Sequence, residues 1–214
     1  KQFDDSEALE LDAEDLIDTL DADDDALAEA APSATPLQPS APIAARDPAA
    51  APAPIPAGDA LRELAQATDR NRIVDVLLGY AAATFDAAVV FTVRDNLAFG
   101  WRAIGELPGH AHVEHLLIPL DAPSVVQAAI AAEAGVFHGP LAPSTVNSYL
   151  YKVLQCAEPP LVTAGAITIG KRVVNVLYGH APPLSPPELE ILRQVCRAAA
   201  EAYARLIAVS KRKR

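Results

Sequence analysis

Hydrophobic and polar residues follow their clearest pattern near the C-terminal end of the chain. Residues 161–169 (LVTAGAITI) and 173–179 (VVNVLYG) are rich in β-branched residues, and a Gly170-Lys171-Arg172 turn separates them. The proline-rich segment PPLSPP follows, and residues 188–209 then repeat apolar positions at helical spacing. This pattern predicts an antiparallel hairpin that leads into one long amphipathic helix.

Residues 59–160 are predicted to alternate between helices and short strands. A helix is expected over residues 73–85, with Asp59 or Thr68 as a candidate cap before it. The other expected elements are, in order, strands at 87–95 and 97–106 joined by an Asp95-Asn96 turn, a loop at 105–114, an extended segment at 115–121, a helix at 122–134 capped by Asp121, a strand at 135–141, and a helix at 146–155 capped by Ser144. We therefore expect an α+β domain, in which an antiparallel sheet of five or six strands carries the N- and C-terminal helices on one face.

Charge divides the chain into two parts, with a net charge of −13 over residues 1–60 and +2 over residues 61–214. We expect residues 1–31 to be an acidic disordered segment, residues 32–58 to be an extended Pro/Ala-rich linker, and residues 59–214 to form the folded domain. The acidic segment also carries leucines near helical spacing, so it has an alternative interpretation as a motif that folds on a protein partner. The acidic excess argues against nucleic-acid binding.

Other features of the sequence concern the compartment and the extent of the chain. No apolar run approaches the ~20 residues that span a bilayer, and the acidic first residues do not form a secretory signal. Two cysteines, Cys156 and Cys196, are too few for a disulfide framework. We expect a cytoplasmic protein that does not associate with membranes. Because the chain contains no methionine and begins with Lys1, we also expect that it continues a longer or processed protein.

Four segments together resemble a known family. They are FDAAVVFTVRDNLAFGWRAIG, IPLDAPSVV, the Gly139-Pro140 pair, and VVNVLYG before the long final helix. Over residues 61–209 the chain resembles the GAF-like domain of deltaproteobacterial (myxobacterial-type) regulatory proteins. The resemblance implies a GAF/PAS-like fold with a six-stranded antiparallel sheet, a ligand pocket on one face, a helical dimer layer on the other, and no catalysis. The family's cyclic-nucleotide signature has no match here, and Cys156 lies outside a bilin-attachment context, so no cofactor is expected.

The final helix carries a seam of apolar or small residues with a period of 3.5. The seam consists of Leu189, Leu192, Cys196, Ala199, Tyr203 and Leu206. A second row, at Ile191, Val195, Ala198 and Ala202, widens the apolar face. The two rows predict that this helix both covers the sheet and pairs with a second copy, so that the protein is a homodimer. The alternative is that the seam only packs on the sheet.

Five polar or aromatic residues are candidates for the ligand pocket. Trp101 could stack on a planar ligand and Arg102 could hold a carboxylate or phosphate, with the two side chains on opposite faces if the strand is regular. The resemblance places Asp121, Ser124 and Asn147 at the rim of the pocket face. The alternative is structural: Trp101 fills the core, Arg102 pairs with a sheet neighbour, and Asp121 and Ser124 start a helix.

Neither a metal site nor an active site is expected. His110, His112 and His115 lie in one segment with Glu114, but they lack the helical frame of a zinc motif and have no cysteine nearby. The chain carries no nucleophile elbow and no phosphate-binding glycine loop.

Two functions are compatible with this pattern. The first is a non-catalytic regulatory domain that binds a small ligand or a protein and passes a change through its terminal helices. The second is a structural adaptor in motility, secretion or transcription machinery, whose acidic segment docks on a partner. Trp101 or Arg102 pointing into an apolar pocket would favour the first function, and a sheet face filled by Phe, Leu and Val side chains would favour the second.

Overall fold

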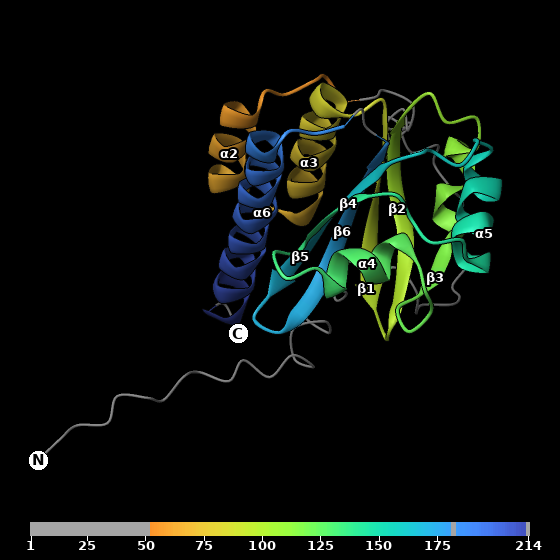
Figure 1. Cartoon of the computed structure of the whole chain (residues 1–214). Helices are drawn as coiled ribbons and strands as arrows, with labels where there is room; N and C mark the ends of the chain where they lie inside the picture. Colours follow the sequence, from red (N-terminus) through yellow and green to blue (C-terminus); the bar gives the residue numbers. More distant parts are fainter. Residues whose placement is uncertain (1–51, 181–182, 213–214) are drawn as a thin grey trace, which may run out of the picture. The chain divides into compact units, whose positions relative to one another are not determined.

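Six strands form one antiparallel sheet in the computed structural model, which describes residues 52–180 and 183–212 (Figure 1). The strands are β1 (Ala87–Arg94), β2 (Leu97–Gly105), β3 (Leu117–Pro119), β4 (Val136–Gly139), β5 (Val162–Ile169) and β6 (Arg172–His180). Their order across the sheet is β3-β2-β1-β6-β5-β4, and each neighbouring pair is antiparallel. The predicted α+β fold with an antiparallel sheet is confirmed. The acidic segment and most of the linker, residues 1–51, lie outside the described residues.

Helices cover both faces of the sheet (Figure 1). On one face, here called the α3/α6 face, lie α2 (Ala57–Gln66), α3 (Arg70–Thr84) and α6 (Pro186–Arg212). On the other, the α4/α5 face, lie the 3-10 helix η1 (His110–His115), α4 (Val125–Ala131) and α5 (Thr145–Leu154). Residues 52–206 belong to one compact unit, and within it the first and last helices share a face, as predicted.

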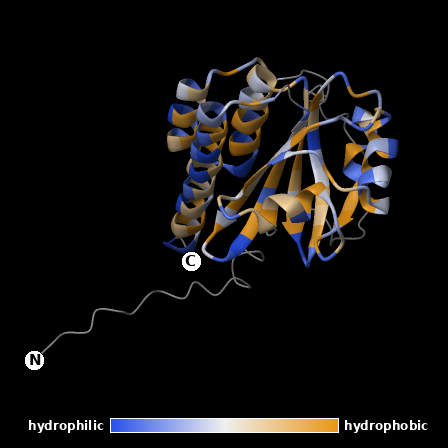
Figure 2. Cartoon of the chain, in the orientation of Figure 1, coloured by the Kyte–Doolittle hydropathy of each residue, from blue (hydrophilic) through white to orange (hydrophobic). Residues whose placement is uncertain are grey.

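Strand β1 shows why the sheet has two hydrophobic faces (Figure 2). Ala88 and Val90 pack on the α3/α6 face, whereas Val89, Phe91 and Val93 pack on the α4/α5 face. Successive side chains of a strand point to opposite faces, so a central strand covered on both sides must be apolar at almost every position.

Helix caps agree with the sequence in one case and differ in others. Ser144 caps α5, as predicted, because its hydroxyl accepts a hydrogen bond from the Asn147 amide at 3.0 Å. The predicted Asp121 cap is wrong: Ser124 caps α4 by accepting from the Gln127 amide, and Asp121 is exposed in the preceding turn. The cap of α3 is Asp69, so the prediction that Asp59 or Thr68 caps this helix is wrong.

Helix α6 begins at Pro186, two residues before the predicted start. The backbone amide and the hydroxyl of Ser185 both donate to the Glu188 carboxylate, at 2.7 and 2.6 Å. Prolines suit the first turn of a helix because the amide that they lack would have no partner there. Pro186 and Pro187 therefore lie in the first turn of the helix that Glu188 caps from Ser185.

The chain approaches α2 along the side of α3. The backbone amide of Ile55 donates to the Gly79 carbonyl at 2.8 Å. A Cβ at Gly79 would meet the Ile55 side chain at 2.5 Å, so any larger residue here would make that side chain shift.

Among the helices of the described residues, none is long and apolar enough to cross a membrane.

Candidate functional site

Large apolar side chains fill the α4/α5 face of the sheet. The largest fully buried ones are Phe91 of β1, Leu116 directly after η1, Ile118 of β3, and Leu150 and Leu154 of α5. This face is the one on which the resemblance places a ligand pocket. In this chain the face is packed with the protein's own side chains, so a ligand on this face would have to bind through its few polar atoms.

Four polar side chains lie together within this apolar layer, and we call them the phenol cluster: Tyr151, Cys156, Tyr178 and His180. Tyr178 is fully buried and Tyr151 is 5% exposed. The rings of Tyr178 and His180 meet edge to face, with 5.2 Å between their centroids. Among the described residues, the hydroxyls of Tyr151 and Tyr178 and the Nε2 of His180 are buried without a hydrogen-bond partner.

The strand and helix that carry the cluster determine its geometry. Tyr178 and His180 are two residues apart on β6, so they point to the same face. Tyr151 lies on the inward side of α5, between the buried Leu150 and Leu154. The helix ends at Gln155 in a left-handed conformation, with φ of 52°, and the next amide, that of Cys156, donates to the Tyr151 carbonyl at 3.1 Å. This turn holds the thiol beside the hydroxyls.

Burial keeps the phenol cluster uncharged. It raises the pKa of Tyr151 to about 12, raises the pKa of Tyr178 well above its usual range, and raises the pKa of the Cys156 thiol. Burial also lowers the pKa of His180, although the Asp86 carboxylate acts in the opposite direction. At neutral pH the cluster therefore offers two phenol hydroxyls, a thiol and a neutral imidazole. This set of groups forms hydrogen bonds but lacks an activated nucleophile.

Trp101 and Arg102 lie on the opposite face of the sheet, and the reason is a β-bulge. Val90 pairs with Arg102 and Phe91 pairs with Gly100, so Trp101 is the extra residue. The bulge breaks the alternation, and both side chains turn to the α3/α6 face. Trp101 is half-buried beside the core there, and the Arg70 guanidinium lies 5.3 Å from its ring centroid.

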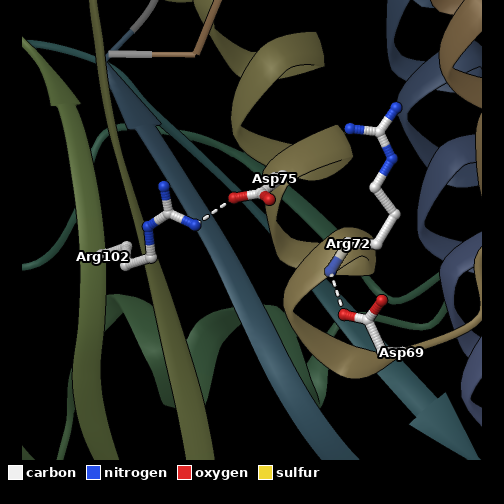
Figure 3. Close-up of polar contacts among 4 residues, drawn as sticks. All are labelled: Asp69, Arg72, Asp75 and Arg102. Atoms are coloured by element: carbon white, nitrogen blue, oxygen red, sulfur yellow. Dashed lines mark hydrogen bonds and ion pairs between the residues drawn. The ribbon is translucent and has the colours of Figure 1, made fainter. Parts of the chain in front are cut away.

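The ion pair of Arg102 is with Asp75, a residue of α3 and not a sheet neighbour (Figure 3). Figure 3 also shows the adjacent helix cap, in which Asp69 accepts from the Arg72 amide. The ion pair links α3 to β2, whereas the cap is local to the start of α3. The structure therefore does not bring Trp101 and Arg102 together with the other three predicted pocket residues.

Asp121, Ser124 and Asn147 lie on the α4/α5 side. Asn147 is 3% exposed and links two segments: its Oδ1 accepts from the Val125 amide at 3.0 Å and its Nδ2 donates to the Ala142 carbonyl at 3.4 Å. With Ser124 as the α4 cap, these two residues join the starts of α4 and α5. Their polar groups are engaged in local structure, and a ligand role for the three residues stays a prediction.

The predicted dimer seam on α6 is buried within the chain. Leu192, Cys196, Ala199 and Tyr203 are at most 4% exposed, and all six seam residues pack with the core of the α3/α6 face. The second row contributes Val195 and Ala202, both fully buried. The exposed residues of the helix include the polar Glu190, Gln194, Arg197 and Glu201 and, towards its C-terminal end, the apolar Ala204, Ala208 and Val209. Dimerisation stays a prediction, and an interface on this helix would involve these exposed residues and not the predicted seam.

The histidine-rich segment forms η1 and not the predicted loop. His110, His112 and His115 are exposed, and Val113 is the buried residue of this 3-10 helix. The rings of His112 and His115 stack with 6.3 Å between their centroids. Within residues 52–180 and 183–212, no three His, Cys, Asp or Glu side chains are placed to hold a metal ion.

Comparison with solved structures supports the predicted fold. The chain is similar to the GAF domain of a phosphoenolpyruvate-protein phosphotransferase from Coxiella burnetii, with a TM-score of 0.56 and 12% identity over 72% of this chain and 96% of that chain. It is also similar to a methyl-accepting chemotaxis protein, with a TM-score of 0.53 and 12% identity over 70% and 98% of the two chains. The fold is that of a GAF domain.

The phycocyanobilin-bound GAF domain from a cyanobacterial phytochrome is also similar, with a TM-score of 0.50 and 14% identity over 71% of this chain and 96% of that chain. No family model matches the sequence. No curated protein matches it either. At these identities the similarity establishes the GAF-like fold alone, and the deltaproteobacterial resemblance stays a prediction.

Sequence reasoning did not select Tyr151, Tyr178 and His180 as site residues. A signal was present in part: Val176, Tyr178 and His180 alternate along a strand, and His180 ends it. Tyr151 is four residues after Asn147 and three before Leu154, which is the spacing of one helix face. What the sequence lacks is the contact between α5 and β6, which depends on the three-dimensional packing of the domain.

Alkaline titration tests the burial of the Tyr178 hydroxyl. Its folded-state pKa is raised, so the stability that it contributes is complete below pH ~10 and is lost as the pH rises further. We expect the free energy of unfolding of the native chain to fall more steeply above pH ~10 than that of Tyr178→Phe, by up to about 1.4 kcal/mol per pH unit. Urea unfolding at a series of pH values measures both slopes.

The matched control is Tyr149→Phe, which removes a hydroxyl from the same type of side chain on the exposed side of α5. Equal slopes for the native chain and Tyr178→Phe would contradict the assignment of a buried, protonated phenol.

Proposed function

We propose that this chain is a cytoplasmic regulatory GAF-like domain without catalytic activity, which controls the activity of a tethered domain. The observation that carries the proposal is the buried phenol cluster in the α4/α5 face, because unsatisfied polar atoms in an apolar layer are costly unless a ligand or water completes them. The structurally similar domains come from chemotaxis, phosphotransferase and phytochrome proteins, which agrees with a role in signalling.

The packing of the same face limits what the domain can bind. Phe91, Leu150 and Leu154 occupy the space on β1 and beneath α5. A ligand as large as a nucleotide or a bilin would require this core to rearrange. The expected ligand is therefore small, or the domain responds to a protein partner at its surface.

The regulatory output passes through the helices of the α3/α6 face in this proposal. The Arg205 guanidinium of α6 donates to the Leu64 carbonyl at the end of α2, at 2.6 Å. The same carbonyl also accepts from the Ala67 amide at 3.3 Å, and the arginine adds a charged donor at this end of α2. This bond gives the first and last helices of the domain a direct connection, and a homodimer formed through these helices would transmit a change in either one.

A structural adaptor is the second candidate. Two observations favour it: Phe, Leu and Val side chains fill the face that would hold a ligand, and Trp101 and Arg102 point away from that face. In this role the acidic N-terminal segment would dock on a protein partner.

Native mass spectrometry of the full 214-residue chain, purified without denaturation, separates the two candidates. We expect a species whose mass exceeds that of the polypeptide by a small ligand, which is lost on collisional activation, and a dimer at micromolar concentration. A chain of polypeptide mass only, from several purifications, would favour the adaptor. A monomer at every concentration up to about 100 μM would contradict the dimer, because obligate assemblies dissociate only far below this range.

A further inference from the structure

The phenol cluster has a chemistry that indicates the class of ligand it takes. Three of its atoms lack a partner among the described residues, namely the two phenol oxygens and the His180 Nε2. A phenol hydroxyl donates one hydrogen bond, and a neutral imidazole accepts one at the nitrogen that carries no proton. With the His180 proton on Nδ1, the cluster offers one acceptor and two hydroxyl donors, and the two hydroxyls lie close enough to act on each other's pKa.

Charge excludes most small ions from this position. The ionisable carboxylates that act on the cluster are Glu158, near Tyr151 and Tyr178, and Asp86, near His180. Both would repel a carboxylate or phosphate ligand. A cation would lose its hydration beside the fully buried Tyr178 side chain. The two carboxylates would not compensate for that loss, because Glu158 and Asp86 are exposed and do not lie within the buried cluster. A neutral ligand avoids both costs.

The surroundings of Cys156 give the direction of access. Cys156 is half-buried, and Ala157, Glu158 and Pro160 of the segment that joins α5 to β5 are exposed. This segment borders the cluster where Tyr151 is nearest to the surface. Because both hydroxyl oxygens are buried, a ligand of a few atoms would reach them from this side only when the segment moves aside.

We propose that the phenol cluster binds a small neutral molecule of the carboxamide class. The carbonyl oxygen of the ligand accepts hydrogen bonds from the Tyr151 and Tyr178 hydroxyls, and its amide N–H donates to the His180 Nε2. This assignment rests on the proposed regulatory function and adds the chemistry of its ligand.

Three molecules of one shape and different charge test the proposal: acetamide, acetate and acetamidinium. Saturation-transfer NMR on the full chain at neutral pH measures which of them binds. We expect acetamide to bind with a Kd in roughly the millimolar range, as suits four heavy atoms, and at least about fivefold more tightly than either ion. Absence of binding by all three, or tighter binding of acetate or acetamidinium, would overturn the proposal.

Two conservative variants locate the binding. Tyr178→Phe and Tyr151→Phe each remove one hydroxyl and keep the ring, and each is expected to weaken acetamide binding about tenfold. Tyr149→Phe is the control, because its hydroxyl lies on the exposed side of α5 and donates to the His115 carbonyl at 3.1 Å. Equal binding by the native chain and both cluster variants would show that acetamide binds elsewhere and would also overturn the proposal.

The outcome is independent of the test of the regulatory function. A ligand found by native mass spectrometry together with no acetamide binding would leave the regulatory function standing and remove the carboxamide assignment.

Discussion

Gly100→Ala is expected to lower the free energy of unfolding by about 3 kcal/mol or more. Gly100 lies within β2 on the α4/α5 face, and η1 packs directly upon it, with the Gly100 amide donating to the Leu116 carbonyl at 3.0 Å. A Cβ at this position would be 2.0 Å from the Val113 carbonyl oxygen. The obstacle is a backbone atom, so no side-chain rotation relieves the overlap. Either η1 moves away and exposes Val113 and Leu116, or β2 loses its register.

The control for this substitution is Gly58→Ala on α2, where nothing lies within 4 Å of the added methyl group. It is expected to leave stability unchanged or to raise it by up to about 1 kcal/mol, since alanine favours helix. Urea unfolding followed by circular dichroism compares both variants with the native chain. A Gly100→Ala chain within about 1 kcal/mol of the native chain would contradict the close packing of η1 on β2.

The sequence predicted those parts of the fold that depend on local pattern. The hairpin of β5 and β6, the Asp95-Asn96 turn and the Ser144 cap are all where the sequence places them. At the turn, Asp95 and Asn96 have φ of 46° and 62°, a left-handed conformation that these two residue types tolerate well. Each of these features depends on residues close together in the chain.

The β-bulge at Trp101 shows where a local pattern fails. Regular alternation would place Trp101 and Arg102 on opposite faces, but one extra residue turns both toward α3. A glycine inside a strand pattern is a recognised sign of a bulge or of a close backbone approach, and Gly100 marks both here. The sign does not specify which neighbouring residue becomes the extra one.

Capping of α4 has a similar explanation. Asp121 and Ser124 are both good caps and both precede an apolar run, so local preference alone does not choose between them. Tertiary contact makes the choice: the Asn147 side chain of α5 accepts a hydrogen bond from the Val125 amide. This contact fixes Val125 as the first residue of the helix.

The phenol cluster could be recognised only from the three-dimensional structure. Tyr151 and Tyr178 are far apart in the chain, on a helix and a strand, and neither belongs to a sequence motif. The same limit applied to the seam of α6. The apolar residues of α6 do recur with a period of 3.5, but they pack on the sheet of their own chain and not on a second copy.

Gly165→Ala tests whether the seam of α6 is packed as described. Gly165 lies in β5 on the α3/α6 face, and a Cβ there would be 2.6 Å from the Cys196 Sγ. Burial raises the pKa of this thiol to about 12, so it stays neutral and acts as a small apolar group. We expect Gly165→Ala to lower the free energy of unfolding by about 1–3 kcal/mol, because the buried sulfur must shift within a close-packed interior.

The double variant Gly165→Ala with Cys196→Ala makes the test specific. After the sulfur, the nearest atoms to the added methyl group belong to Leu192 at 3.8 Å, an ordinary contact distance, so removal of the sulfur relieves the overlap. The two single losses should therefore exceed the loss in the double variant by about 1 kcal/mol or more, measured as a coupling energy by urea unfolding. Additive losses would mean that Cys196 does not face β5, and the seam would then be available to a second copy of the chain.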